Sequence, residues 1–392
     1  MSQLLSPFLK SRLLTPGPTP SPDWAKLAAA SADIYHRSPA FVPYIKRCQT
    51  NLARYFGSEQ HPIILTSSGT GAMEAAVLNF TDIEDEVLVL AAGKFGERWA
   101  QIANTFQCKV HSLKVEWGKT TDFEAILEKL KLNPRITKIF LQATETSTGV
   151  FHPLDQWLPK LRPLFNGLII VDAISALLAH NIKMDEWGID VCLAASQKGF
   201  GVAPGLAFVC VADKAWNKMS KRGAYYFNLQ KEREAQSQGS TSWTSATTLI
   251  KELDAVLEYL AEFQIEDINN HHKVLALATR AAIRAMGLEL FVEKNFCYTL
   301  TAFCPPKNIE SSKLLKVLRE KYSATFSGGQ DHLKGRIVRI SHLGFIDPFE
   351  MLGAVGLLEC ALLDLGHSLE VGKASAAFLS TAYEKFKTAP KN

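Results

Sequence analysis

The chain has 392 residues, of which 47% are hydrophobic and 21% are charged, and its formal net charge is +4. At about 150 residues per domain, this length predicts two or three compact units, and the composition excludes an intrinsically disordered protein. The small and dispersed positive excess does not predict nucleic-acid binding, and no apolar stretch is long enough to span a bilayer.

The seven cysteines include no C-x-x-C pair, which argues against a zinc ribbon or a disulfide framework. Reduced thiols in the core of a cytoplasmic protein are the simpler interpretation. The N-terminal segment lacks the apolar core and small-residue cleavage site of a signal peptide. We therefore expect a soluble, cytoplasmic protein with no metal site and no membrane or nucleic-acid partner.

The first feature along the chain is the Pro/Gly cluster Thr15–Pro22, which cannot form a helix interior because proline lacks a backbone donor. We expect residues 1–22 to form an extended N-terminal arm. From Ile63 onward, short apolar runs alternate with helix-like stretches. The expected strands are Ile63–Thr66, Glu86–Leu90, Lys138–Gln142, Leu168–Asp172, Val191–Ser196 and Leu206–Val211. The expected helices are Gly71–Asn79, Glu97–Phe106, Asp122–Leu132 and Leu154–Leu164. This alternation predicts an α/β fold with a mostly parallel sheet covered on both faces.

After Trp243 the pattern changes to longer amphipathic helices mixed with few strands, which predicts a smaller α+β unit. Expected there are helices at Leu249–Phe263, His272–Met286, Ser311–Tyr322, Phe349–Leu365 and Ala376–Phe386, and strands at Cys297–Phe303 and Gly335–Ser341. We expect a large domain at 23–272 and a small carboxy-terminal domain at 273–392. The pair His271–His272 predicts a solvated or capping role rather than a metal site.

The first chemical signal is the segment Leu65–Gly71, where a strand ends in a glycine-containing turn that opens a helix. Unpaired amides and the helix dipole at such a turn favour an anion, and Ser68 and Thr70 carry hydroxyls that can donate to it. The segment matches neither a Walker A loop nor G-x-G-x-x-G. A capped strand–helix turn therefore explains it as well as a phosphate site does.

Two charged residues follow apolar strands further along. Asp172 ends the run Ile169–Val171, and Lys198 follows the strand Val191–Ser196. Taken alone, Asp172 is explained by capping of the next turn and Lys198 by a solvated surface group. Together with an anion site, they supply what pyridoxal 5'-phosphate requires, namely a phosphate anchor, a partner for the pyridinium nitrogen and a Schiff-base amine.

The sequence as a whole resembles the class V aminotransferases of fold type I, in particular the alanine/serine–glyoxylate aminotransferase group. The resemblance covers nearly the whole chain and is carried by motifs in a fixed order. These are LTPGPTP (Leu14–Pro20), HRSP (His36–Pro39), SSGTGAMEA (Ser67–Ala75), KFGERW (Lys94–Trp99), ETSTGV (Glu145–Val150), VDAISAL (Val171–Leu177), SQKGF (Ser196–Phe200), APG (Ala203–Gly205), WTSAT (Trp243–Thr247) and VRISHLG (Val338–Gly344). It implies a seven-stranded-type sheet in the large domain and pyridoxal 5'-phosphate as cofactor.

The resemblance also implies residue roles. Lys198 would form the Schiff base and Asp172 would face the pyridine nitrogen. Phosphate contacts would come from Ser68, Gly69, Thr70 and Gln197; Phe95 would stack on the ring, and Thr146 would bond near its phenolic oxygen. Arg339 would grip the substrate carboxylate, and Tyr35 lies in the segment that approaches the substrate.

In this family the site lies at a homodimer interface, and Thr244 matches the threonine that reaches the partner's phosphate. Thr241 and Ser245 depart from the family pattern, since some members have tyrosine and proline there. The resemblance implies transfer of an amino group from alanine, serine or aspartate to a 2-oxo acid such as glyoxylate or pyruvate. The alternatives are a phosphonate-specific transaminase, a cysteine desulfurase or lyase of the same fold, and a non-catalytic subunit of a larger complex.

Overall fold

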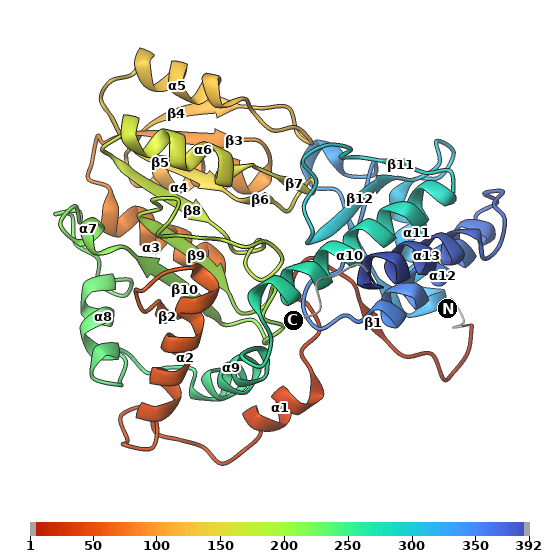
Figure 1. The fold of residues 1–392 in the computed structure, drawn as a ribbon, viewed down its shortest axis with the longest axis horizontal. Coiled ribbons are helices and arrows are strands. Elements are labelled where there is room, and N and C mark those ends of the chain that lie inside the picture. Colours follow the sequence, from red (N-terminus) through yellow and green to blue (C-terminus); the bar gives the residue numbers. More distant parts are fainter. Residues whose placement is uncertain (1–4, 388–392) are drawn as a thin grey trace.

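The larger part of the chain is built around a seven-stranded sheet, seen in the computed structural model, which describes residues 5–387 (Figure 1). The strand order is β2-β10-β9-β8-β5-β3-β4. The strands are β2 (Ile63–Thr66), β3 (Glu86–Ala91), β4 (Lys109–Lys114), β5 (Ile136–Gln142), β8 (Leu168–Asp172), β9 (Val191–Ala195) and β10 (Leu206–Val211). Only β10 runs antiparallel to its neighbours within this sheet. The predicted α/β class with a mostly parallel sheet is therefore confirmed.

Helices cover both faces of this sheet, because its inner strands are apolar on both sides; all five residues of β8 are buried. In chain order they are α1 (Asp23–Ala29), α2 (Val42–Phe56), α3 (Gly69–Phe80), α4 (Lys94–Thr105), α5 (Phe123–Leu132), α6 (Leu154–Leu161), η1 (Arg162–Leu164), α7 (Asp213–Trp216), α8 (Leu229–Ser237) and α9 (Thr247–Leu260). One core contains side chains of α2, α5, α6 and α9, and the core on the opposite face contains those of α3, α4 and α8. The side chains of β8 alternate between the two cores, Ile169 into one and Ile170 into the other.

The sequence did not predict α1, α2, β4, α7 and α8, and three of these show why. Strand β4 lies at the sheet edge and is only partly buried, so its residues lack the continuous apolar run of the inner strands. Helix α2 carries Pro43 in its first turn, where a missing amide costs nothing. Helix α8 is mostly polar and buries only Leu229, Glu232 and Gln236.

The carboxy-terminal part forms a second, four-stranded antiparallel sheet with its own core. Its sheet order is β11-β12-β15-β14, with β11 (Glu289–Leu290), β12 (Leu300–Cys304), β14 (Ser327–Gly328) and β15 (Val338–Ser341). The helices are α10 (Ile265–Ala285), α11 (Ser311–Tyr322), η2 (Asp331–Leu333), α12 (Pro348–Asp364) and α13 (Lys373–Lys387). The long helix α10 runs from the large sheet unit into this second unit (Figure 1). The boundary predicted at residue 272 falls inside it.

The histidine pair in α10 corrects one expectation. His272 is 2% exposed, so it is not solvated, and its Nδ1 bonds the His342 carbonyl at 2.9 Å. His271 is partly buried, and its Nε2 bonds the Ile346 carbonyl. Both residues lie on the side of α10 that packs against the segment after β15, which periodicity alone did not reveal.

The N-terminal arm links the two units. Strand β1 (Arg12–Leu13) pairs in parallel with β13 (Ala324–Thr325) of the carboxy-terminal unit. Beyond it, the Thr19 amide donates to the Gln197 carbonyl at 3.1 Å, and the Thr19 hydroxyl donates to the Lys198 carbonyl at 2.8 Å. The arm therefore reaches the residue that the motif analysis singled out.

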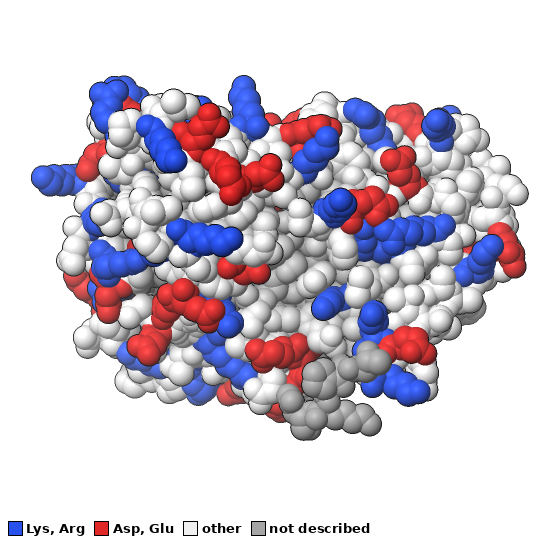
Figure 2. All heavy atoms as spheres, turned by 45° about the horizontal axis from the view of Figure 1, so that its top comes forward, with Lys and Arg blue, Asp and Glu red and all other residues white. Residues whose placement is uncertain are grey.

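The surface and the helices of the described residues agree with the composition. Figure 2 shows basic and acidic side chains interspersed on the visible face, without a continuous positive stripe. Between residues 5 and 387, no helix is long and apolar enough to cross a membrane.

Candidate active site

A cavity of about 290 Å³ lies at the carboxyl ends of the parallel strands of the large sheet. These ends meet at one edge, where open α/β sheets collect their ligands. Its wall contains eight of the residues predicted from the sequence, namely Ser68, Gly69, Thr70, Phe95, Thr146, Asp172, Gln197 and Lys198. They come from five separate segments, each placed there by the strand that precedes it; Thr146 follows the short strand β6 (Thr144–Glu145), which pairs with β7 (Val150–Phe151).

The amine of Lys198 is buried under the N-terminal arm. Its Nζ donates a hydrogen bond to the Pro16 carbonyl at 2.5 Å. A side chain at Gly17 would place its Cβ 2.5 Å from that same Nζ, so the arm can approach only with glycine there. Burial lowers the pKa of Lys198 to about 8, with the nearby charge of Asp172 acting in the opposite direction. A substantial fraction of this amine is therefore uncharged near pH 8.

Asp172 is 5% exposed at the end of β8 and has few partners. Its Oδ1 accepts the Ile174 amide at 2.8 Å. Burial raises the pKa of Asp172 to about 7; the negative charge of Glu145 raises it further, and Lys198 and Arg98 lower it. The carboxyl group is thus poised to ionise when a cation comes close.

Helix α3 begins at the cavity and presents the amides of its first turn. Ser68 is its N-cap, and the Ser68 hydroxyl oxygen accepts the Gly71 amide at 3.4 Å. The Thr70 hydroxyl oxygen accepts a hydrogen bond from Arg98 Nη1 at 3.0 Å, which leaves its own hydrogen free to donate. Gln197 also lines the cavity, and of its amide group only the NH₂ end can donate to an anion. The helix amides and these side-chain donors suit an anion.

Arg339 stands on β15, behind the cavity wall, and is 6% exposed. Its Nε and Nη2 donate to the Gly328 carbonyl at 3.0 and 2.7 Å, and its Nη1 donates to the Thr146 carbonyl at 2.7 Å. Burial lowers the pKa of Arg339 to about 10, and Glu145 acts in the opposite direction. The hydroxyl of Thr146 in turn bonds the Ser175 hydroxyl at 2.6 Å.

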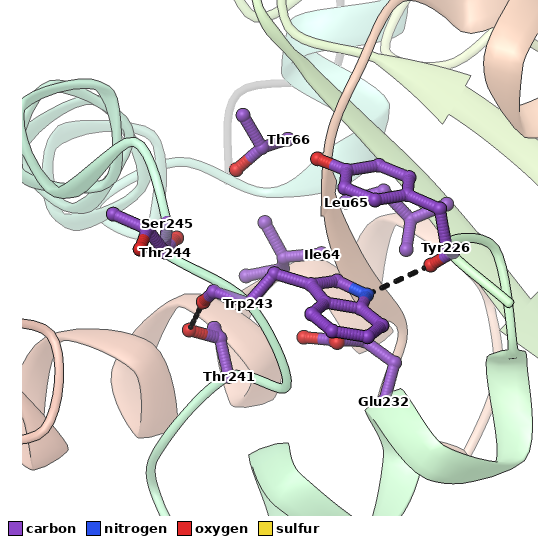
Figure 3. Close-up of a pocket in the computed structure, with 9 residues that line it drawn as sticks. All are labelled: Ile64, Leu65, Thr66, Tyr226, Glu232, Thr241, Trp243, Thr244 and Ser245. Atoms are coloured by element: carbon purple, nitrogen blue, oxygen red, sulfur yellow. Dashed lines mark hydrogen bonds between the residues drawn. The ribbon is translucent and has the colours of Figure 1, made fainter.

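Besides Arg339, which stands behind the wall, two predicted site residues do not line this cavity. Thr244 is exposed on the loop before α9, beside Trp243, whose indole nitrogen donates to the Tyr226 carbonyl at 2.9 Å (Figure 3). In the same loop the Thr241 hydroxyl donates to the Trp243 carbonyl at 2.7 Å, so it stabilises the loop from within. Tyr35 is 63% exposed and packs edge-on against His36. The roles expected for Thr244 and Tyr35 stay predictions.

Two residues near the cavity were given no definite role on sequence grounds. Glu145 belongs to the ETSTGV motif and is buried. Its negative charge acts to raise the pKa of both Asp172 and Arg339. Arg98 lines the cavity, with its guanidinium 4.7 Å from the centre of the Phe95 ring. The signal for Glu145 in the sequence is a carboxylate three residues after the apolar run that forms β5 (Ile136–Gln142).

Comparison with known proteins gives consistent similarities. The sequence profile of the aminotransferase class-V family matches residues 25–342. The chain is 36% identical to the soluble hydrogenase 42 kDa subunit of Anabaena cylindrica, covering 91% of this chain and 94% of that one. It is 32% identical to the serine–glyoxylate aminotransferase of Hyphomicrobium methylovorum, over 93% of each chain. Among solved structures, an aspartate aminotransferase from Thermus thermophilus superposes with a TM-score of 0.83 at 31% identity, covering 90% of this chain and 99% of that one.

Proposed function

The chain belongs to the class V aminotransferases, and from that premise we propose that it transfers amino groups with the help of pyridoxal 5'-phosphate. The donor is a small amino acid, namely alanine, serine or aspartate, and the acceptor is a 2-oxo acid such as glyoxylate or pyruvate. The observation that carries the proposal is the buried pair Lys198 and Asp172 in one cavity with the N-terminus of α3.

The residues present fit this cofactor. The first turn of α3, the Thr70 hydroxyl and the NH₂ group of Gln197 would hold the phosphate. Phe95 would face the ring, and Asp172 would pair with the ring nitrogen. When bound, the cofactor supplies an aldehyde that condenses with amines and a cationic ring that accepts electron density.

Lys198 is the group that would hold the cofactor and move protons. With its pKa lowered to about 8, its Nζ is a far better nucleophile and base at neutral pH than an exposed lysine. Once the substrate amine has displaced it, the same Nζ would take the proton from the substrate Cα. The carbonyl of Pro16, its present partner, limits where the amine can point.

Asp172 would keep the ring nitrogen protonated. A buried carboxyl group whose pKa is about 7 ionises readily when a cation is placed beside it, because the ion pair then offsets part of the desolvation penalty. The hydrogen bond from the Ile174 amide fixes Oδ1 of Asp172 and leaves the other oxygen for that cation.

Arg339 would bind the carboxylate of the substrate. A guanidinium group has five N–H donors, and the three hydrogen bonds to Gly328 and Thr146 leave one donor on each of Nη1 and Nη2. Those two can bind a carboxylate in parallel. One guanidinium group that binds a carboxylate close to Lys198 suits small amino-acid donors.

A homodimer with a shared site is part of the proposal. Thr244 is exposed on the loop before α9 (Figure 3). Tyr225, which packs against Trp243 of that loop, is 83% exposed, so this surface is open to a second copy of the chain. Tyr35 would then approach the substrate across the interface. Sedimentation of the purified protein would show a dimer, and Thr244→Val would weaken cofactor binding while leaving the dimer intact.

The alternatives differ in what they require. A desulfurase needs a reactive cysteine near the amine, but no cysteine lines the cavity among the described residues, and Cys297 is fully buried against Thr299. A phosphonate-specific transaminase would use the same core, so only its substrate distinguishes it. The name of the Anabaena relative favours a second candidate, a subunit of a hydrogenase complex. The Lys198 and Asp172 pair argues that such a subunit would still be catalytic.

The test is reconstitution of the purified chain with pyridoxal 5'-phosphate, followed by gel filtration. We expect a yellow protein whose visible band fades with an effective amino donor and returns with an effective acceptor. Panels of alanine, serine, aspartate, cysteine and aminophosphonates, then of glyoxylate and pyruvate, identify the pair. A protein that binds no cofactor contradicts the proposal, and sulfide release from cysteine would favour the desulfurase.

A further inference from the structure

Glu145, the last residue of β6, is a fully buried carboxylate with an unusual number of donors around it. Its two oxygens accept the amides of Phe95 at 3.2 Å, Gly96 at 3.0 Å and Ser147 at 3.1 Å. The Ser147 hydroxyl also donates to Oε1 at 2.5 Å. These four donors satisfy a charge that would otherwise be costly to bury.

Two of these donors belong to the first turn of α4, which has no cap of its own. The N-cap residue of α4 is Gly93, which has no side chain that could accept an amide hydrogen. A Cβ at Gly93 would lie 2.4 Å from Cδ of Glu145, so the glycine leaves the space that the carboxylate fills. Glu145 therefore caps α4 from a different segment of the chain, and its charge favours the positive end of that helix.

The groups that this contact orders are cavity groups. Phe95, whose amide is held, presents its ring to the cavity. Thr146, the next residue after Glu145, lines the cavity with its side chain and accepts Arg339 Nη1 with its carbonyl oxygen. One buried carboxylate thus fixes the ring-facing wall and the main-chain carbonyl that orients Arg339.

We propose that Glu145 is a positioning residue, which holds Phe95 against the cofactor ring and Thr146 under Arg339. The inference rests on the proposed function, since both positions matter only if a ring and a substrate carboxylate bind there. Glu145 touches neither of them, so its effect must appear in cofactor affinity and substrate KM rather than in proton transfer.

The decisive variant is Glu145→Gln, in which an amide NH₂ group replaces one acceptor oxygen and faces the amides of α4. We expect the Kd for pyridoxal 5'-phosphate, measured by equilibrium ultrafiltration of the cofactor-free protein, to rise by about tenfold or more. The circular dichroism of the bound chromophore should weaken, and the KM for the amino donor should rise more than kcat falls. Gly93→Ala, which displaces the carboxylate without removing its charge, should give the same pattern.

The matched control is Glu359→Gln. Glu359 is another buried carboxylate that caps a helix from a distance, because it accepts the Ala374 amide at 3.0 Å and the Ser375 hydroxyl at 2.9 Å at the start of α13. It should lower stability to a similar degree and leave cofactor affinity, chromophore dichroism and KM unchanged.

Cofactor affinity and dichroism at wild-type level in Glu145→Gln and Gly93→Ala would overturn the inference, as would equal losses in Glu359→Gln. If Glu145→Gln does not fold, Gly93→Ala alone decides the question. Failure of the proposed function looks different, because the wild-type chain itself would then bind no pyridoxal 5'-phosphate.

Discussion

Two groups of buried titratable side chains lie in this molecule, and they differ in how many partners they have. In the cavity, Asp172 accepts one amide and Lys198 donates to one carbonyl. At the junction between the two units, His342 bonds the Tyr298 carbonyl at 2.8 Å and the Thr301 hydroxyl at 3.1 Å. There the His180 ring lies stacked between Phe151 and Tyr298, at 4.0 and 4.5 Å between ring centres.

Burial acts on both groups, but its consequence differs. It lowers the pKa of His180, His272 and His342 to about 3, so these rings are neutral at any physiological pH and serve as hydrogen-bonding core. It brings the pKa of Asp172 to about 7 and that of Lys198 to about 8, where a small change of environment moves a proton. Burial alone therefore does not mark a reactive site; titration near neutral pH in a cavity does.

The largest effect is expected at Lys198, in the cavity group. Lys198→Ala removes the amine that the cofactor and the Cα proton both need, so kcat should fall by at least about 10³-fold. Stopped-flow or steady-state transamination measures this, with Lys183→Ala, an exposed lysine, as control. Turnover within about tenfold of wild type would show that another lysine holds the cofactor.

Arg339→Lys should give the next largest effect. An ammonium group cannot reproduce the planar fork that bonds Gly328, Thr146 and a carboxylate together. We expect the KM for amino donors to rise by about 10²-fold, with cofactor affinity nearly unchanged. Titration with the donor series measures this, and an equal loss for amines that lack a carboxylate would contradict the role.

His342→Phe tests the junction. It leaves the Tyr298 carbonyl and the Thr301 hydroxyl without partners, which costs about 2 kcal/mol at pH 7.5. The pKa of His342 is lowered in the folded state, so the unfolded chain binds its proton first and stability is lost as pH falls from 6.5 towards 3. The variant lacks that loss, so urea unfolding at pH 5 should show a smaller difference from wild type than at pH 7.5. An equal difference at both pH values would mean that His342 titrates normally.

Asp172→Asn should change the pH dependence of stability in the opposite direction. The pKa of Asp172 is raised in the folded state, so the cofactor-free protein binds this proton more tightly than the unfolded chain between pH 3.8 and 7. Stability from this group is present below pH 3.8 and is lost as pH rises towards 7. The variant should therefore gain about 2.5 kcal/mol relative to wild type between pH 5 and 7.5, measured by urea unfolding without cofactor. No relative gain would mean that Lys198 keeps Asp172 ionised.

The sequence by itself determined the fold class and most of the cavity wall. The apolar runs of β8 and β9 predicted where these strands end; Asp172 is the last residue of β8, and Lys198 lies three residues after β9. Parallel strands place their carboxyl ends at one edge of the sheet, so the position of a motif at the end of a strand also predicted where it lies in the fold. The segment Ser67–Gly71 was predictable for the same reason.

Only the tertiary structure decided the rest. Glu145 caps α4 across about 50 residues, the arm lies on Lys198 across more than 180, and His272 is buried because α10 packs against the segment after β15. Such contacts join segments that are far apart in the chain, and they have no periodic signature in the sequence. The local sequence pattern determines which strand or helix a residue follows. Packing between distant segments determines which groups the residue contacts, and those contacts determine its charge and its role.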